Sequence, residues 1–260
     1  MKHLIPIISA LMLLTIGCTS QKKLAYLNNL PPAGGEETFT MEIPDYKIQP
    51  RDILYVTIKA MTPDGRITDF LSTGSSVGVN LTQGESGGYL YGFDVDMEGK
   101  IVIPAVGQVS VSGLTLEKTR KVVQDLADKV FKNSTVECKL LSFKFTVIGE
   151  VRTPGTYINY NNYLTVLEAI GRAGGVDDYG NRSKVLVVRP MDKGTKTFRL
   201  NLQDKKILTS DAYFLLPNDV VIVEPLSQKI FNMNLPTISF ILTALTSSIT
   251  MTLLLINYLK

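Results

Sequence analysis

The strongest constraint on this chain is an uncharged stretch at its C-terminal end. Residues 230–259 contain no Asp, Glu, Lys or Arg and lie between Lys229 and Lys260. As a helix, Leu235 to Ile256 would extend about 33 Å, which is enough to cross the hydrocarbon core of a membrane. Pro236 suits the first turn of such a helix, where its missing N–H costs nothing. We therefore expect a single transmembrane helix over residues 233–258.

The polar residues of this segment are not scattered. They recur at three- and four-residue steps, interrupted only by Leu254, and form one stripe: Ser239, Thr243, Thr246, Ser247, Thr250 and Asn257. The other side of the helix carries isoleucine and leucine. A ring of helices would turn the stripe toward water as a pore lining, and helices about 10 Å wide leave a lumen of about 16 Å for eight copies but about 4 Å for four. Plain helix packing is the alternative, because Ser and Thr are common at helix contacts in membranes.

The N-terminal segment has the features of a secretion signal. Lys2 and His3 precede a short apolar run that ends in Gly17 and Cys18, so we expect residues 1–17 to be a signal peptide. The ending Leu-Thr-Ile-Gly-Cys resembles a lipobox, which implies that Cys18 is lipidated. An ordinary signal peptide with an incidental cysteine is the alternative.

Charge and histidine content exclude several classes of function. Loss of Lys2 lowers the 27 basic residues to 26, against 24 acidic residues, and no basic block is present, so nucleic acid is not an expected partner. His3 is the only histidine, so the mature chain lacks the commonest general base and zinc ligand. We expect no metal, no cofactor and no catalytic residue.

Two further features have simple structural interpretations. Cys138 alternates with apolar neighbours, which indicates a buried core thiol. The carboxylate pairs Asp94 with Asp96 and Asp177 with Asp178 lie at turns, where carboxylates are usually solvated, so we do not expect an enzyme.

Between the two ends, the pattern predicts an α+β fold. Residues 18–45 read as a tether without compact structure, and the glycine-rich residues 61–93 as a long loop. We expect the aromatic residues at its end, Tyr89, Tyr91 and Phe93, to pack back onto their own domain, and contact with sugar rings is the alternative. The first predicted strands are 53–58, 93–96 and 101–103, and the last two pair around the turn 97–100. A helix follows from Thr115, closed by Asn133 and Ser134, and residues 136–148 alternate between apolar and polar side chains as a strand does. A capped helix is predicted from Thr165 to Gly174, followed by strands at 184–189, 197–202 and 220–223. Strands that bracket single helices indicate α+β domains.

The chain then matches two known sequence patterns. Residues 46–52, Tyr-Lys-Ile-Gln-Pro-Arg-Asp, resemble the opening "YxIxPGD" of the polysaccharide export domain, with Arg51 in place of the glycine, and residues 95–107 resemble its hairpin. Residues 147–157, 164–170 and 173–175 are similar to a soluble-ligand-binding β-grasp (SLBB) repeat.

The resemblance implies a polysaccharide export domain over 46–141, an SLBB domain over 142–226 and the C-terminal helix. It implies a bacterial outer-membrane lipoprotein with its domains in the periplasm. Copies would form a homo-oligomeric ring that exports capsular or extracellular polysaccharide, with an inner-membrane co-polymerase or tyrosine kinase as partner. The single β-grasp repeat implies a short vestibule. The alternative is a monomeric anchored lipoprotein that binds a glycan or other soluble ligand through its β-grasp domain.

Overall fold

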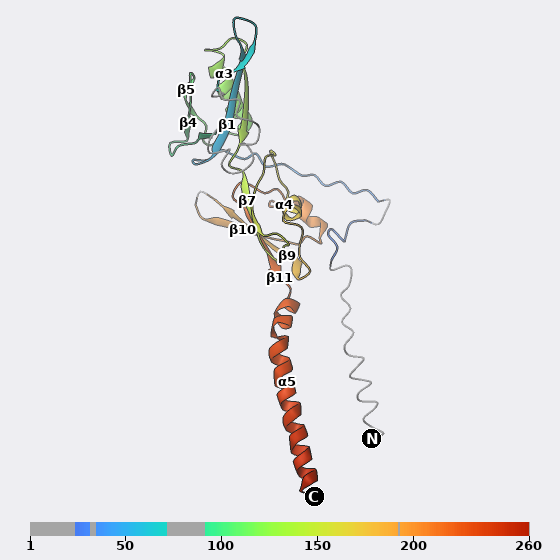
Figure 1. The fold of residues 1–260 in the computed structure, drawn as a ribbon. Helices are drawn as coiled ribbons and strands as arrows, with labels where there is room; N and C mark the ends of the chain where they lie inside the picture. Colours follow the sequence, from blue (N-terminus) through green and yellow to red (C-terminus); the bar gives the residue numbers. More distant parts are fainter. Residues whose placement is uncertain (1–23, 32–34, 72–91, 192, 260) are drawn as a thin grey trace.

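The computed structural model describes residues 24–31, 35–71, 92–191 and 193–259. Two α+β domains lie end to end above one long helix (Figure 1). The predicted signal peptide (1–17), Cys18 and the aromatic residues Tyr89 and Tyr91 lie outside the described residues. The elements are β1 (Ile53–Met61), β2 (Ile67–Asp69), β3 (Phe93–Asp94), β4 (Lys100–Ile103), β5 (Gly107–Ser110), α3 (Leu116–Ala127), β6 (Thr135–Leu140), β7 (Lys144–Gly149), β8 (Gly155–Ile158), α4 (Val166–Arg172), β9 (Gly180–Pro190), β10 (Thr195–Leu200), the 3₁₀ helix η3 (Lys205–Thr209), β11 (Val220–Pro225) and α5 (Ser227–Tyr258).

The first domain is built around β1, which pairs with β2, β3 and β6. Alternate β1 side chains are buried, and α3 packs Val123 and Ala127 into the same core. The Thr115 side chain accepts from the Lys118 N–H, which confirms the predicted start of α3. The predicted end was wrong: α3 stops at Ala127, before Asn133 and Ser134.

A side-chain network explains the early end of α3. The Gln124 amide donates to both the Asp128 carboxylate and the Ser134 carbonyl, and the Ser134 hydroxyl donates to the same carboxylate. The segment after Ala127 therefore folds back on the helix, an arrangement that side-chain periodicity does not reveal.

The predicted hairpin around residues 97–100 has the right turn but the wrong strand partners. Gly99 adopts φ +79 and donates to the Asp96 carbonyl, and an added Cβ would come within 2.4 Å of the Ser112 Cβ. Beyond this turn, β3 pairs with β1 and β4 pairs with β5. The strands part because the Val95 N–H donates to the carbonyl of Asp52 instead of continuing the hairpin.

The second domain holds a five-stranded sheet in the order β10-β9-β11-β7-β8, in which β11 runs parallel to β7 and antiparallel to β9. The predicted capping box is present, with Thr165 and Glu168 bonded in both directions, and α4 ends before two glycines at positive φ. The three predicted strands after α4 correspond to β9, β10 and β11. The alternating run 136–148 is divided between β6 and β7, which belong to different sheets.

The expectation that residues 18–45 lack compact structure is wrong for part of this segment. The N–H groups of Leu27 and Asn28 donate to the carbonyls of Leu202 and Gln203, at 3.0 and 2.8 Å. Leu27 also packs against the core of the second domain. This segment is therefore docked on the second domain, because main-chain bonds hold a stretch whose own pattern predicts nothing regular.

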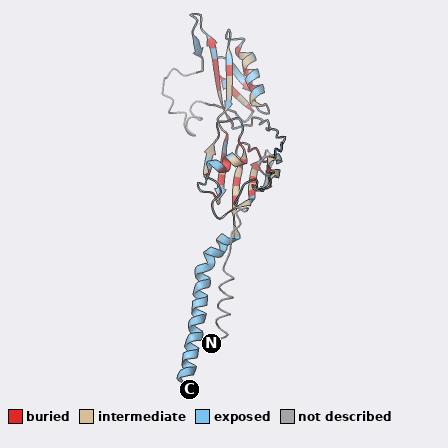
Figure 2. Cartoon of the chain, turned by 90° about the vertical axis from the view of Figure 1, so that its right-hand side faces the viewer, coloured by how far each residue is buried: buried red, intermediate tan, exposed pale blue. Residues whose placement is uncertain are grey.

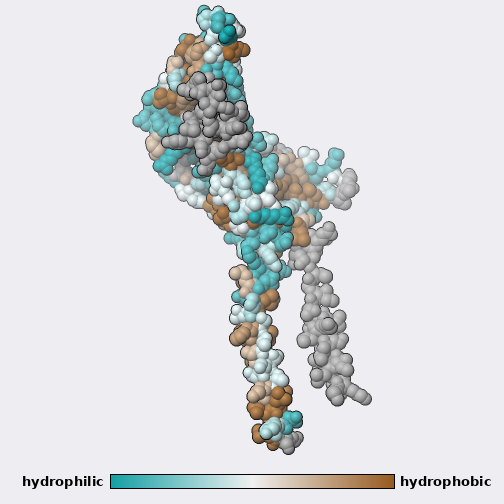
Figure 3. All heavy atoms as spheres, in the orientation of Figure 1, coloured by the Kyte–Doolittle hydropathy of each residue, from teal (hydrophilic) through white to brown (hydrophobic). Residues whose placement is uncertain are grey.

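The long helix α5 begins earlier than its uncharged stretch suggests. It starts at Ser227, so Pro236 lies inside the helix and not in its first turn as predicted. Proline removes one helical hydrogen bond and its ring bends the axis, and Figure 2 shows α5 bent near its upper end. No residue of α5 is buried within the described chain. Figure 3 shows little strongly hydrophilic surface along it compared with the two domains.

Candidate functional site

The root of α5 is fixed to the second domain by contacts from two separate loops. The Leu226 N–H donates to the Tyr179 carbonyl at 2.7 Å, and the Asn232 amide donates to the Tyr179 hydroxyl at 3.2 Å. On the other side, Lys229 Nζ lies 2.5 Å from Glu150 Oε1, whose side chain is only 15% exposed. Three bonds over the first two turns therefore set the direction in which the helix leaves the domain.

Glu150 reaches α5 because the chain before it makes an unusually close approach. Gly149, at φ +92, ends β7, and an added Cβ would lie 2.1 Å from the carbonyl oxygen of Val223. The next residue, Glu150, donates its N–H to that same carbonyl at 3.0 Å. Position 149 therefore requires glycine, because only a residue without a Cβ lets β7 come close enough to β11 to place Glu150 beside the root of α5.

The predicted pore-lining residues all lie on α5 and are exposed. At about 100° per residue they fall within an arc of about 100°, so the helix does bring them together along one face. We call this set, Ser239, Thr243, Thr246, Ser247, Thr250 and Asn257, the first stripe. Its hydroxyls donate to helix carbonyls, for example Thr243 to Ser239 at 2.7 Å and Thr246 to Thr243 at 3.0 Å. The hydroxyl donors of Ser239, Thr243, Thr246 and Thr250 are satisfied within the helix, and their oxygen lone pairs remain to accept.

The sequence pattern did not single out a second set of hydroxyls on the opposite face. Thr237, Ser248 and Thr252 form this second stripe, and the latter two donate to Ala244 and Ser248 carbonyls at 2.8 Å. Their spacings of eleven and four residues are each close to a whole number of helical turns, so the pattern was available as a signal. Because hydroxyls occur on two faces, hydroxyl content alone does not identify the side that meets water.

One face of α5 between these stripes is apolar along the whole uncharged stretch. It comprises Phe231, Leu235, Ile238, Leu242, Leu245, Ile249, Leu253 and Ile256. These side chains recur at three- and four-residue steps without a polar interruption. This is the part of the helix surface best suited to acyl chains.

The first stripe continues toward the domain. Gln228 and Asn232 fall within the same arc as Ser239 and Thr243, so polar side chains follow one face of α5 from its root. Gln228 lies before the uncharged stretch 230–259 and Asn232 lies before the predicted helix 233–258, so neither residue was included in the predicted stripe.

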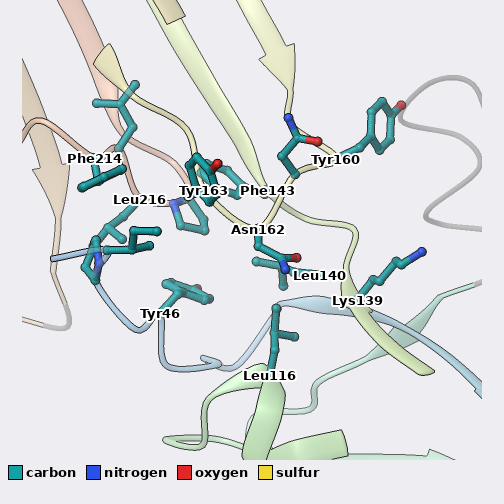
Figure 4. A pocket seen from close by; sticks show the side chains of 15 residues that line it. Tyr46, Leu116, Lys139, Leu140, Phe143, Tyr160, Asn162, Tyr163, Phe214 and Leu216 are labelled. Atoms are coloured by element: carbon teal, nitrogen blue, oxygen red, sulfur yellow. The ribbon is translucent and has the colours of Figure 1, made fainter. Parts of the chain in front are cut away.

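A small cavity lies where the two domains meet. Its volume is about 30 Å³, enough for about one water molecule but not for a sugar. Figure 4 shows Tyr46 of the first domain and Tyr163 and Phe214 of the second around it. We interpret this cavity as a packing seam.

The aspartate of the first sequence motif is structural and supports this seam. Asp52 is buried and accepts hydrogen bonds from the Tyr46 hydroxyl at 2.8 Å and the Ser142 hydroxyl at 2.9 Å. The motif's first tyrosine and its last aspartate thereby hold the start of the first domain against the segment that leads into the second.

The cysteine and the aspartate pairs that could have carried chemistry lie in the core or at turns. Cys138 lies on β6 opposite Val56, partly buried against the first core, and burial raises the pKa of its thiol to about 12. Asp94 and Asp96 are exposed, and Asp96 accepts the Lys100 N–H of the turn. Asp177 and Asp178 lie in the turn before β9. Within the described ranges no three His, Cys, Asp or Glu residues form a metal-binding group.

Comparisons with known proteins agree with this organisation. The family model described as polysaccharide biosynthesis/export protein matches residues 41–141, and the SLBB domain model matches 143–223. The EPS I polysaccharide export outer membrane protein EpsA of Ralstonia solanacearum is 30% identical over 140 residues, covering 52% of this chain and 36% of that protein. The protein of the same name from Ralstonia nicotianae is 30% identical over 102 residues, covering 38% and 27%. The match thus spans about a third of these relatives. With an export domain followed by an SLBB domain and an apolar C-terminal helix, the chain belongs to the polysaccharide export family.

Proposed function

We propose that this protein is an outer-membrane lipoprotein whose copies assemble into a conduit for capsular or extracellular polysaccharide. The observation that carries the proposal is α5, a helix that is uncharged beyond Lys229, carries a polar stripe and is fixed at its root to an SLBB domain. The relatives are named as polysaccharide export outer membrane proteins, which supports both the cargo and the membrane.

The dimensions of α5 support a membrane-spanning role. Its 32 residues extend about 48 Å, more than the hydrocarbon core requires, so the first turns of the helix, near Lys229, would remain outside the lipid. Exposed apolar surface of this length is unstable in water. Lipid on the apolar face and neighbouring helices on the sides would cover it.

A ring of helices supports the passage of a glycan. With the first stripe inward, about eight copies leave a lumen of about 16 Å, which admits a hydrated chain, whereas four leave about 4 Å. Uncharged hydroxyls offer weak, exchangeable hydrogen bonds, so a sugar chain is not trapped. In this arrangement the second stripe, opposite the first, would lie on the outer side of the ring, where the hydroxyls of Ser248 and Thr252 stay bonded to helix carbonyls.

The docked N-terminal segment supports a lipid anchor in the same membrane. Leu24 follows Cys18 by six positions, so the acylated cysteine would lie at most about 22 Å from it. Leu24 lines the same groove as Leu226 and Asn232 at the root of α5. Lipid on Cys18 and the helix would therefore enter one membrane, with both domains on its periplasmic side.

The partners follow from this arrangement. The first domain lies at the end of the molecule farthest from α5 (Figure 1) and would face the inner membrane, where the co-polymerase or tyrosine kinase of the export system resides. The protein itself would perform no reaction, and the energy for transport would come from that machinery.

The native mass of the full-length, detergent-extracted protein tests the proposal. We expect a ring of many copies, with a central opening in averaged particle images. Deletion of the gene should also abolish surface polysaccharide. A monomeric particle would support the alternative, an anchored glycan-binding lipoprotein, and normal surface polysaccharide in the deletion strain would reject an export role.

A further inference from the structure

A groove of about 470 Å³ lies at the root of α5, a size typical of small-ligand sites. One wall is the turn and first residues of β9, and the other is the start of α5. Leu24 and Gln203 complete it. Its lining residues are Leu24, Asp178, Tyr179, Gly180, Asn181, Arg182, Ser183, Gln203, Leu226, Gln228 and Asn232.

The walls carry mainly uncharged hydrogen-bonding groups. Asn181, Gln203, Gln228 and Asn232 contribute carboxamides, each of which both donates and accepts. A sugar hydroxyl also donates and accepts, so carboxamides match it in either direction. The ring of Tyr179, 40% exposed, adds the flat apolar surface on which the C–H face of a sugar can lie.

The two charged residues of the groove do not make it a site for an anion. Arg182 donates to the Val176 carbonyl at 3.0 Å, and its guanidinium lies 5.7 Å from the centroid of the Tyr26 ring. Asp178 brings a negative charge to the same wall. An acidic ligand would meet one cation and one carboxylate, whose charges offset each other, so the groove offers it no net electrostatic attraction and favours neutral units.

The position of the groove connects it to the helix. Gln228 and Asn232 line it and also begin the polar face that continues through Ser239 and Thr243. The Asn232 amide is held by the Tyr179 hydroxyl, which fixes the aromatic ring and the amide relative to each other. A chain that leaves the groove along α5 would therefore meet hydroxyls without crossing the apolar face.

We propose that this groove binds an uncharged, hydroxyl-rich segment of the exported glycan before it enters the helical passage. This rests on the proposed export function. Two amides from α5 and one ring from the second domain form the site, so ligand binding and the direction of α5 involve the same contacts. Binding is weak and rapidly reversible, since the groove is open and its bonds are made in competition with water.

Ligand-observed NMR on the full-length protein in detergent tests this site. The probe is a set of short oligosaccharides made by partial hydrolysis of the extracellular polysaccharide of the producing strain. We expect saturation transfer to sugar ring protons, and the double substitution Gln228→Ala with Asn232→Ala should weaken binding about tenfold. Tyr179→Ala should weaken it further, whereas Tyr179→Phe should retain most of the binding through the ring.

Asn162→Ala is the matched control, because it removes an exposed amide at the junction cavity instead of this groove. Equal binding by wild type and the double variant, or an equal loss with Asn162→Ala, would overturn the site. Binding that falls steeply with added salt would also overturn it, since that result identifies a charged ligand. If the oligosaccharides do not bind while gene deletion still abolishes surface polysaccharide, the groove proposal fails and the export function stands.

Discussion

Arg51 occupies a position that suits glycine. Its φ is +76, a left-handed conformation that costs a residue with a Cβ about 1 kcal/mol or more, and it stands where the matching motif has glycine. The substitution Arg51→Gly should therefore raise the free energy of unfolding of the first domain by about 1 kcal/mol, measured from denaturant unfolding by circular dichroism. Arg51→Ala removes the same side chain but keeps the strain and should gain nothing. Equal stabilisation by both variants would show that the side chain, not the backbone, is responsible.

The thiol of Cys138 should be almost inert in the folded protein. Burial raises its pKa from the usual 9.0 to about 12, so near pH 8 the thiolate fraction is about a thousandfold below that of a free thiol. Alkylation by iodoacetamide should slow by about that factor and recover in urea. The raised pKa also makes the stability of the protein depend on pH. The folded state holds the Cys138 proton more tightly than the unfolded state, so the contribution of this proton to the free energy of unfolding is complete below pH 9 and is lost as the pH rises from 9 toward 12. Rapid alkylation of the folded protein would contradict this environment.

At the scale of elements, local signals were reliable where local interactions decide the structure. The Thr115 cap, the capping box at Thr165 and the glycines after α4 act within a few residues, and all are present. Strand partners were not predictable in the same way. The strand before the Gly99 turn pairs with β1 because the Asp52 carbonyl, distant in sequence, accepts its N–H group. Pairing depends on which edges meet in space, and alternation reveals only which face is buried.

In the candidate site, too, features set by local sequence were predictable and features built from distant segments were not. The first stripe follows from helical periodicity alone, so its members were predicted. The groove was not, because its walls come from four segments: Leu24, residues 178–183, Gln203 and the start of α5. The docking of residues 27–29 was hidden for the same reason, since main-chain bonds to Leu202 and Gln203 leave no side-chain pattern.

The close contact of β7 with β11 gives a prediction for this pair of strands. In Gly149→Ala the new methyl would meet the Val223 carbonyl at 2.1 Å, so the strands must separate and the Glu150 contact with Lys229 must shift. We expect a loss of at least about 3 kcal/mol in the free energy of unfolding of the second domain. Gly171→Ala in α4 is the control, because nothing lies within 4 Å of its added Cβ and alanine favours a helix. It should be neutral or stabilise by up to about 1 kcal/mol. Similar melting of both variants would show that the close approach carries no cost.

At the scale of the whole molecule, the two domains, the docked N-terminal segment and α5 act as one directed unit. The junction seam joins the first domain to the second, and the bonds of Glu150 and Tyr179 join the second domain to the helix. In the proposed assembly, the orientation of each domain would therefore fix which face of α5 points inward. A ring formed by the domains would set the direction of the first stripe before the helices meet.

If the domains set the direction of the first stripe, its side chains can be replaced without disturbing the ring, and this substitution tests whether the stripe lines the passage. Replacing Thr243, Thr246, Ser247 and Thr250 together with leucine would line the proposed lumen with apolar groups, and a narrow apolar channel expels water. Surface polysaccharide should fall at least about tenfold, while the native mass of the extracted particle and its membrane attachment stay unchanged, because the domains still form the ring. The control replaces Thr243, Thr246 and Thr250 with serine, which keeps every hydroxyl and should preserve export. If the leucine variant exports normally as an intact ring, water and glycan do not pass along this face. If the ring itself dissociates, the first stripe holds neighbouring helices together instead of lining the passage.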